Sequence, residues 1–182
     1  MKRFLIIILV LGLTSIATAT NTGKLLQLSV NGQVAPDEIT MFPSDYITLD
    51  IMVADGHSTD AIEIDLEIIG PGSITVPADP RDMLSDCFED WSLIILDVTD
   101  KGIGTIAAVS FGQCSGVIVD HIEFHFDDVG DVIVKITLDG VCNIDGSPIT
   151  EAQMGSIIIS MVPEPASMLL LGLGGLLLRR RK

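Results

Sequence analysis

In the central part of this chain, apolar residues recur at every second position. Residues 62–68 read Ile-Glu-Ile-Asp-Leu-Glu-Ile, and residues 26–30 and 47–53 alternate in the same way. Successive side chains of a β-strand point to opposite faces, whereas an amphipathic helix needs apolar residues three or four positions apart. The pattern therefore predicts half-buried strands with one dry face and one acidic, hydrated face.

Similar segments continue through the rest of the central region. Asp139-Gly140 and Asp145-Gly146 mark turns near its end. Further strands are expected at Ser73–Val76, Leu93–Val98, Thr105–Phe111, Val117–Phe126, Asp131–Leu138 and Ser156–Met161. About 8–9 short strands with Gly, Asp and Pro between them predict an all-β fold, an antiparallel β-sandwich.

One segment departs from this pattern and predicts a short helix near residues 80–89. Asp79 is a suitable N-cap, and Pro80 suits the first helical position. After it, apolar residues recur three or four positions apart, as on one face of a helix: Met83, Leu84, Cys87, Phe88 and Trp91. The alternative is an irregular loop held down by the same aromatic residues.

The N-terminus has the pattern of a secretory signal peptide. A basic start is followed by an apolar run from Phe4 to Leu13, and then by a small and polar stretch that ends Ala17-Thr18-Ala19. Because Ala-x-Ala precedes signal peptidase sites, we expect cleavage after Ala19 and a signal peptide over residues 1–19. The alternative is a buried N-terminal helix.

The C-terminus combines a Pro-Glu-Pro motif, an apolar run and a basic end. Pro163, Glu164 and Pro165 precede the apolar residues 166–178, for which we expect a membrane helix. At about 1.5 Å per residue this helix reaches only about 20 Å, against about 30 Å of hydrocarbon. The final cations are Arg179, Arg180, Arg181 and Lys182. They favour the cytoplasmic side, which would leave the preceding domain outside.

These three features, in this order, resemble the PEP-CTERM sorting signal over residues 163–182. The resemblance implies processing near Pro163–Pro165 by an exosortase-type membrane enzyme. It also implies export to the cell envelope or extracellular matrix of a Gram-negative-type bacterium, with only transient anchoring in the inner membrane. A plain single-span anchor with a Pro-rich hinge is the alternative reading.

Between the two end segments, residues 20–162 are long enough for one domain with its own core. This region holds 24 acidic residues and four basic ones, a net charge of −20. Such a charge repels phosphate backbones, which excludes nucleic acid as a partner. The same charge attracts divalent cations.

Three cysteines occur, Cys87, Cys114 and Cys142. None has the Cys-x-x-Cys spacing of a metal or redox site. In an oxidising compartment two of the three can pair, but their spacing leaves open which two.

Calcium is the metal that the acidic turns favour, and we expect no other cofactor. Asp127, Asp128 and Asp131 bring three carboxylates together at a turn, and Asn143 with Asp145 forms a second oxygen-rich corner. Neither stretch matches an EF-hand loop. The alternative is that these carboxylates are simply solvated.

No pattern in the chain indicates an enzyme, and we assign no catalytic residues. His121, Glu123 and His125 share one face of an expected strand, but the two histidines lie about 13 Å apart at ~3.4 Å per residue. That separation is too large for easy coordination of one ion. Motifs of serine hydrolases, zinc proteases and phosphate loops do not occur.

Glycan binding would require exposed aromatic rings as flat platforms. Tyr46 and Trp91 are the suitable residues, with Phe42 and Phe88 as weaker additions. Because Trp91 follows the expected helix, we assign it to the core. The scarcity of aromatic residues disfavours a conventional carbohydrate-binding module.

Several segments resemble the cohesin-like and carbohydrate-binding-module β-sandwiches. They are residues 45–51, 61–74, 121–126 and 130–136, which carry patterned hydrophobic residues and turns. The resemblance implies a binding module for a dockerin-like partner, a glycan or another surface protein.

We therefore expect an exported, non-enzymatic protein of the cell surface or extracellular matrix. Signal peptidase and the exosortase would process it, and an exopolysaccharide or another surface protein would be its partner. Two alternatives are a specific binding module, for a dockerin-like partner or a glycan, and an extracellular hydrolase. The hydrolase would need two carboxylates about 5–10 Å apart in a groove.

Overall fold

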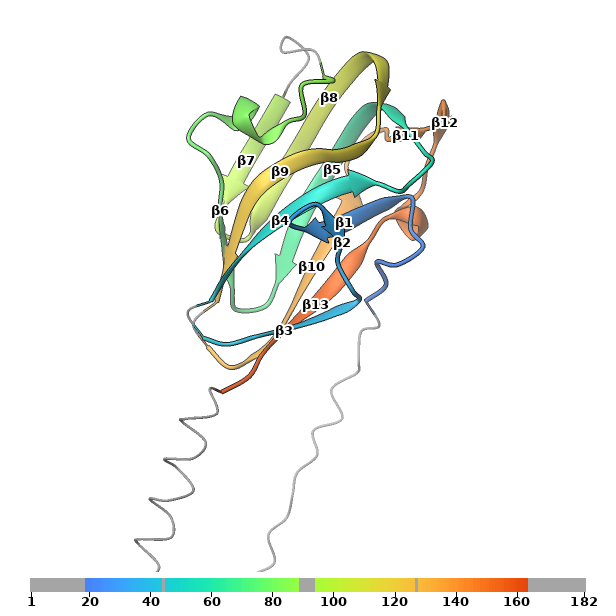
Figure 1. The fold of residues 1–182 in the computed structure, drawn as a ribbon. Helices are drawn as coiled ribbons and strands as arrows, with labels where there is room; N and C mark the ends of the chain where they lie inside the picture. Colours follow the sequence, from blue (N-terminus) through green and yellow to red (C-terminus); the bar gives the residue numbers. More distant parts are fainter. Residues whose placement is uncertain (1–18, 44, 89–93, 127, 164–182) are drawn as a thin grey trace, which may run out of the picture.

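The computed structural model describes residues 19–43, 45–88, 94–126 and 128–163, which form two β-sheets packed face to face (Figure 1). The strands are β1 Leu26–Val30, β2 Gln33–Val34, β3 Glu38–Met41, β4 Tyr46–Val53, β5 Thr59–Ile69, β6 Ser73–Thr75, β7 Ile94–Thr99, β8 Gly102–Cys114, β9 Gly116–His125, β10 Gly130–Leu138, β11 Asn143–Ile144, β12 Ser147–Pro148 and β13 Ser156–Met161.

Sheet A has the strand order β2-β1-β4-β9-β6. Sheet B has the order β12-β11-β5-β10-β13-β3, with β8 also paired to β5 and β7 paired to β8. Neighbouring strands are antiparallel except β3 and β13, which run parallel from Glu38↔Ile158 to Met41↔Met161. The predicted all-β sandwich is confirmed.

The alternation in the sequence separates the core from the surface as expected. On β5, Ile62, Ile64 and Leu66 are buried between the sheets, while Glu63 and Glu67 lie on the outward face. Phe124 of β9 is the largest fully buried side chain and meets this core from sheet A. Burial of these aliphatic and aromatic side chains, at about 1.5–3 kcal/mol each, is the main source of stability.

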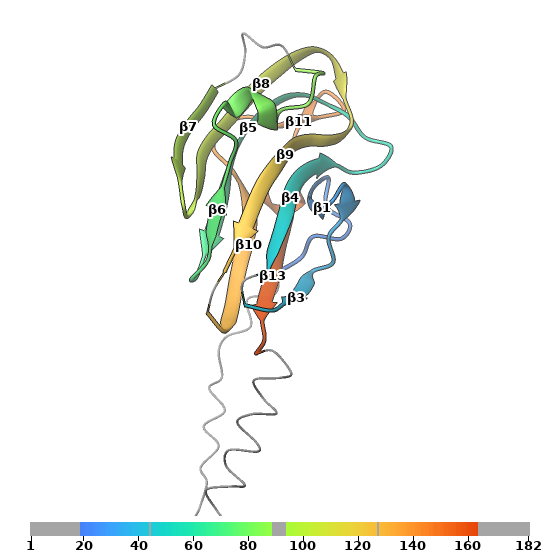
Figure 2. The ribbon, with the colours of Figure 1, turned by 60° about the vertical axis from the view of Figure 1, so that its left-hand side comes forward.

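The helix expected near residues 80–89 is shorter than predicted, a 3₁₀ turn over Pro80–Met83. Asp79 caps it as expected, since its carboxylate accepts a hydrogen bond from the backbone N–H of Arg81 (3.0 Å). The turn stops because Leu84 is extended and forms a bridge with Val119 of β9. The segment therefore lies against the edge of sheet A (Figure 2). Apart from the single 3₁₀ turn, it is closer to the irregular loop considered as the alternative than to the expected helix. Trp91 lies outside the described residues.

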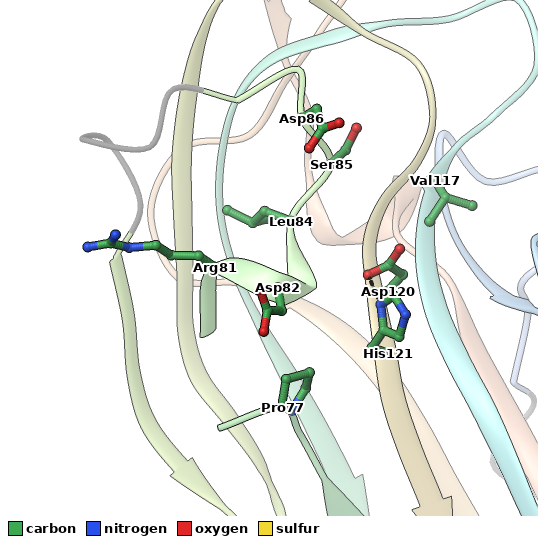
Figure 3. A pocket seen from close by; sticks show the side chains of 9 residues that line it. All are labelled: Pro77, Arg81, Asp82, Leu84, Ser85, Asp86, Val117, Asp120 and His121. Carbon is green, nitrogen blue, oxygen red and sulfur yellow. Dashed lines mark hydrogen bonds and ion pairs between the residues drawn. The ribbon is translucent and has the colours of Figure 1, made fainter. Parts of the chain in front are cut away.

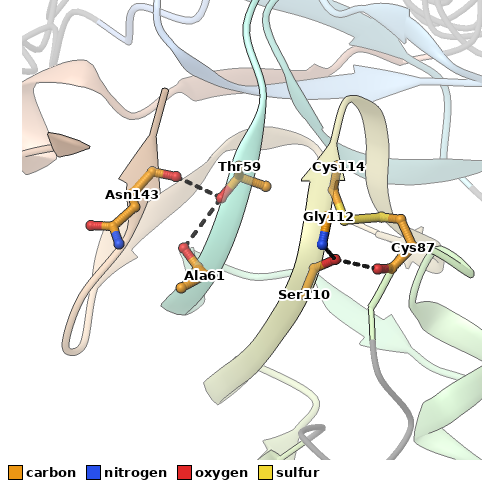
Figure 4. The surroundings of a disulfide bond; sticks show 7 residues. All are labelled: Thr59, Ala61, Cys87, Ser110, Gly112, Cys114 and Asn143. Carbon is orange, nitrogen blue, oxygen red and sulfur yellow. Dashed lines mark hydrogen bonds between the residues drawn. A yellow bond between two sulfur atoms is a disulfide. The ribbon is translucent and has the colours of Figure 1, made fainter. Parts of the chain in front are cut away.

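A disulfide joins Cys87 to Cys114, so the pairing that the sequence left open is resolved. The hydroxyl of Ser110 on β8 donates to the carbonyl of Cys87 at 2.6 Å, beside the disulfide (Figure 4). Cys142 is a buried free thiol, and burial, with a smaller effect of Asp60, raises its pKa to about 12. The disulfide and the hydrogen bond from Ser110 thus fix the segment after the 3₁₀ turn to sheet B.

The residue that follows the expected signal cleavage is hydrogen-bonded to the last strand. Thr20 exchanges hydrogen bonds with Ser156 at the start of β13. The buried amide of Asn21 donates to the carbonyls of Leu28 and Ala35 and accepts from the N–H of Leu28, each at 2.7 Å. Asn21 therefore joins β1 to the loop after β2. The expected signal peptide itself falls almost entirely outside the described residues.

At the other end, β13 runs directly into the Pro-Glu-Pro motif. The N–H of Val162 donates to the carbonyl of Met41, and Pro163 is exposed. The expected membrane helix over 166–178 lies outside the described residues. Among the residues that are described, no helix has the length and apolarity needed to cross a membrane.

Candidate protein-binding surface

Large apolar side chains gather on the outward face of sheet B, at its β7–β8 end. The pairs Ile94↔Ala107 and Ala61↔Val109 place these side chains on adjacent strands. Phe111 follows two positions after Val109, and buried Ser110 lies between them. Phe111 is 81% exposed, Ile94 51% and Val109 44%. We call Ile94, Ala107, Val109 and Phe111 the apolar patch.

A row of carboxylates on β5 lies beside this patch. Glu63 faces Ala107 across the β5–β8 ladder, and Asp65 and Glu67 follow on the same outward face. Asp139 completes the group, which we call the acidic row, because its backbone N–H donates to the carbonyl of Glu63.

The acidic row is only partly neutralised by neighbouring groups. Lys135 forms an ion pair with Glu67 (2.8 Å), and the hydroxyl of Thr105 donates to Asp139 (2.9 Å). One carboxylate oxygen of Asp65 is buried without a hydrogen-bond partner. Burial, followed by the charges of Asp139 and Glu67, raises the pKa of Asp65 above its ordinary value. Unneutralised negative charge thus adjoins an exposed apolar surface.

This surface has the composition of an interaction site. Contiguous exposed apolar side chains with a polar rim mark binding surfaces, because water solvates them poorly. A partner with apolar side chains over the patch and cations over the acidic row would complement both parts. One feature of the sequence indicates the patch. Residues 106–111 read Ile-Ala-Ala-Val-Ser-Phe, so the outward positions of β8 are apolar, whereas those of β5 carry carboxylates.

The residues expected to hold calcium are described only in part. Asp127 lies outside the described residues, Asp128 is exposed, and Asp131 accepts a hydrogen bond from the hydroxyl of Ser160 at 2.8 Å. Within the described ranges, no group of three or more His, Cys, Asp or Glu residues is arranged to hold a metal ion. Calcium at this turn remains a prediction.

The second oxygen-rich corner is occupied by internal interactions. Asp145 accepts from the backbone N–H of Ser58 (3.0 Å) and pairs with Nδ1 of His57 (2.6 Å). The His57 hydrogen bond, followed by that from Ser58, lowers the pKa of Asp145. The carbonyl of Asn143 accepts from the Thr59 hydroxyl (2.7 Å). These contacts join the β11–β12 hairpin to the start of β5.

His121, Glu123 and His125 lie on the outward face of sheet A, as their spacing predicts. His121 interacts with Asp120, and this hydrogen bond and charge raise the pKa of the imidazole. His125 instead stacks on Tyr46, with ring centroids 4.2 Å apart and planes inclined by 10°. Phe88, considered above as a platform residue, belongs to the core, and Phe42 is partly exposed.

The C-terminal segment matches a known sorting motif. Residues 162–182 match the PEP-CTERM protein-sorting motif. The resemblance to this sorting signal, drawn from Pro163, Glu164, Pro165 and the basic end, is therefore confirmed, whereas processing near Pro163–Pro165 remains a prediction. A PEP-CTERM motif of this kind indicates an exported surface protein and processing by an exosortase. No curated protein matches this sequence.

The solved structures to which this chain is similar include cohesin modules. The seventh ScaB type I cohesin from Pseudobacteroides cellulosolvens is 9% identical, with a TM-score of 0.49 over 76% of this chain and 92% of that one. A cohesin module from a Clostridium perfringens glycoside hydrolase is 12% identical, with a TM-score of 0.47 over 81% and 99%. CaCohA2 from Clostridium acetobutylicum is 14% identical, with a TM-score of 0.47 over 76% and 92%.

Proposed function

We propose that this chain is an exported, non-enzymatic protein of the cell surface or extracellular matrix that binds a partner protein through the outward face of sheet B. The PEP-CTERM motif at residues 162–182 supports export. The observation that carries the binding role is the apolar patch, in which Phe111 is 81% exposed beside Val109 and Ile94.

The physical basis of binding is removal of the patch from water. Full burial of an aromatic or aliphatic side chain contributes about 1.5–3 kcal/mol, and Phe111 exposes most of its surface. The acidic row would add orientation, because Glu63, Asp65 and Asp139 attract a partner with lysine or arginine beside its apolar residues. A dockerin-like module or another surface protein of this composition is the partner that we propose.

Binding is tested with residues 20–162, since the buried core residues of the described chain lie between Leu26 and Met161 and the domain contains its own disulfide. The domain is immobilised and exposed to an envelope extract of the native host. The test variant is Phe111→Ser, and the matched control is Phe42→Ser, which also removes a partly exposed phenylalanine but lies away from β7 and β8. Captured proteins are identified by mass spectrometry.

We expect the wild type and Phe42→Ser to retain the same protein and Phe111→Ser to lose it. A domain that captures no protein, or one that captures the same protein with Phe111→Ser, contradicts the proposed binding face. Circular dichroism of the two variants checks that both are folded.

Export and processing are tested on the full chain in its native host. Mass spectrometry of the mature protein should find a first residue Thr20 and a C-terminus near Pro163–Pro165. Replacement of Glu164 by Ala should retain the unprocessed tail in the membrane fraction. A full-length chain with both ends intact in the cytosol would refute the proposal.

A further inference from the structure

A hollow opens at the edge of sheet A, away from the apolar patch. β6 pairs with β9 as far as Thr75↔Glu123, and the chain returns to β9 at the bridge Leu84↔Val119. Between these points residues 76–83 leave β9 and form the 3₁₀ turn. The resulting hollow has a volume of about 790 Å³, within the range of ligand sites (Figure 3).

The strand opposite this hollow has a β-bulge. Leu49 pairs with Ile122 and Ile51 with Val119, so two residues of β9 face one residue of β4. His121 has a φ of 58°, in the left-handed region that residues with a Cβ seldom adopt. The bulge redirects Asp120 and His121 toward residues 77–86, as Figure 3 shows.

The lining of the hollow is polar and mainly anionic. Asp82 and Asp86 come from the segment around the 3₁₀ turn, and Asp120, which is paired with His121, comes from β9. The guanidinium of Arg81 extends away from these carboxylates (Figure 3). A cationic group is therefore better suited to the hollow than an anionic one.

The hollow continues along β9 toward an aromatic platform. A second hollow of about 260 Å³ shares His121 with the first and is also lined by Thr48 and Glu123. Two pairs further along the ladder, Tyr46 faces His125, and the two stacked rings stand on the outward face. Tyr46 is 64% exposed. We call this run of hollows and rings the β9 groove.

The two ends of the β9 groove point to one ligand class. The face of the Tyr46 ring that does not stack on His125 provides a flat surface for the apolar face of a sugar ring, and a tyrosine ring also attracts a nearby ammonium group. Carboxylates and the hydroxyl of Thr48 can accept hydrogen bonds from amino and hydroxyl groups. We propose that the β9 groove binds a polysaccharide whose sugars carry free, protonated amino groups. This site is separate from the protein-binding face and goes beyond the function proposed above.

The probes are glucosamine oligosaccharides, their N-acetylated forms of equal length and lysine oligopeptides. Binding to residues 20–162 is measured by calorimetry at pH 6 and low salt. We expect glucosamine oligomers to bind about tenfold more tightly than the acetylated forms, which lack the cationic amine. The acetylated sugars test the charge, and the lysine peptides test whether charge alone is sufficient.

Tyr46→Ala and Asp82→Asn should each weaken glucosamine binding about tenfold, through loss of the platform and of a charge in the hollow. Ile69→Ser, at the end of β5 in sheet B and outside both proposed surfaces, is the control and should bind the sugar as the wild type does. Because the two surfaces share no residue, a failure of the protein-binding proposal does not affect this one. Circular dichroism checks that each variant is folded.

Three outcomes would overturn the proposal. The first is equal affinity for acetylated and free-amine sugars. The second is binding of lysine peptides at least as tight as that of the sugars and unaffected by Tyr46→Ala, which would make the groove a cationic-peptide site. The third is no binding of any probe by the folded wild type.

Discussion

The disulfide between Cys87 and Cys114 should supply a large part of the stability of this domain. It closes a loop with a sequence separation of 27. In the chain-entropy treatment of the unfolded state, a cross-link of this length contributes about 3.5 kcal/mol at 25 °C. Because small domains are stable by only about 5–15 kcal/mol, the double variant Cys87→Ala/Cys114→Ala should remain folded but be clearly weakened.

The assay is urea unfolding at pH 7, followed by circular dichroism, with Cys142→Ala in both proteins to prevent thiol exchange. We expect the free energy of unfolding to fall by about 3.5 kcal/mol in the double variant. Reductant should weaken the parent protein by a similar amount and leave the double variant unchanged. A loss below about 1 kcal/mol, or a double variant that still responds to reductant, would refute the reasoning.

Three further effects follow from the polar contacts. Asn21→Ala removes three buried hydrogen bonds and should lower the free energy of unfolding by about 3 kcal/mol in urea; a loss under about 1 kcal/mol would contradict the assigned role. Asp65 has a raised pKa, so its charge destabilises the fold at neutral pH. Asp65→Asn should raise Tm by about 2 °C at pH 7, and the gain should vanish as the pH falls through that raised pKa; a gain that persists in acid would show another cause. The pKa of Asp145 is lower in the folded protein than in the unfolded chain, so the interaction with His57 stabilises the fold at any pH above the unfolded-state pKa. This stabilisation is lost as the pH falls through the folded-state pKa. Asp145→Asn should therefore lower the urea midpoint at pH 7 but not in strong acid.

The strands that could be predicted are those in which burial alternates cleanly. β5 has aliphatic residues on one face and carboxylates on the other, and the predicted strand at residues 62–68 lies inside it. β3 was not predicted: residues 38–41 alternate polar and apolar side chains, but four residues are too short a run to indicate a strand on their own. They form a strand by pairing with β13, which is far away in sequence.

The candidate sites were harder to predict because they depend on register and on contacts distant in sequence. The spacing of His121, Glu123 and His125 predicts a shared face, but nothing in it predicts the bulge that turns Asp120 and His121 toward residues 77–86. The stack of His125 on Tyr46 requires the β4–β9 register. Likewise, the pairing of the cysteines becomes clear only when β8 passes the segment after the 3₁₀ turn.

The hydrogen bond from Val162 to Met41 has a consequence for how the finished protein is displayed. The last strand is held by the fold up to the residue before Pro163, and the Pro-Glu-Pro motif begins there. If the chain is trimmed at that motif, only one to three residues would separate the last residue hydrogen-bonded to the sandwich from the new C-terminus. Whatever is joined at that end would therefore lie close to the β3–β13 edge of sheet B.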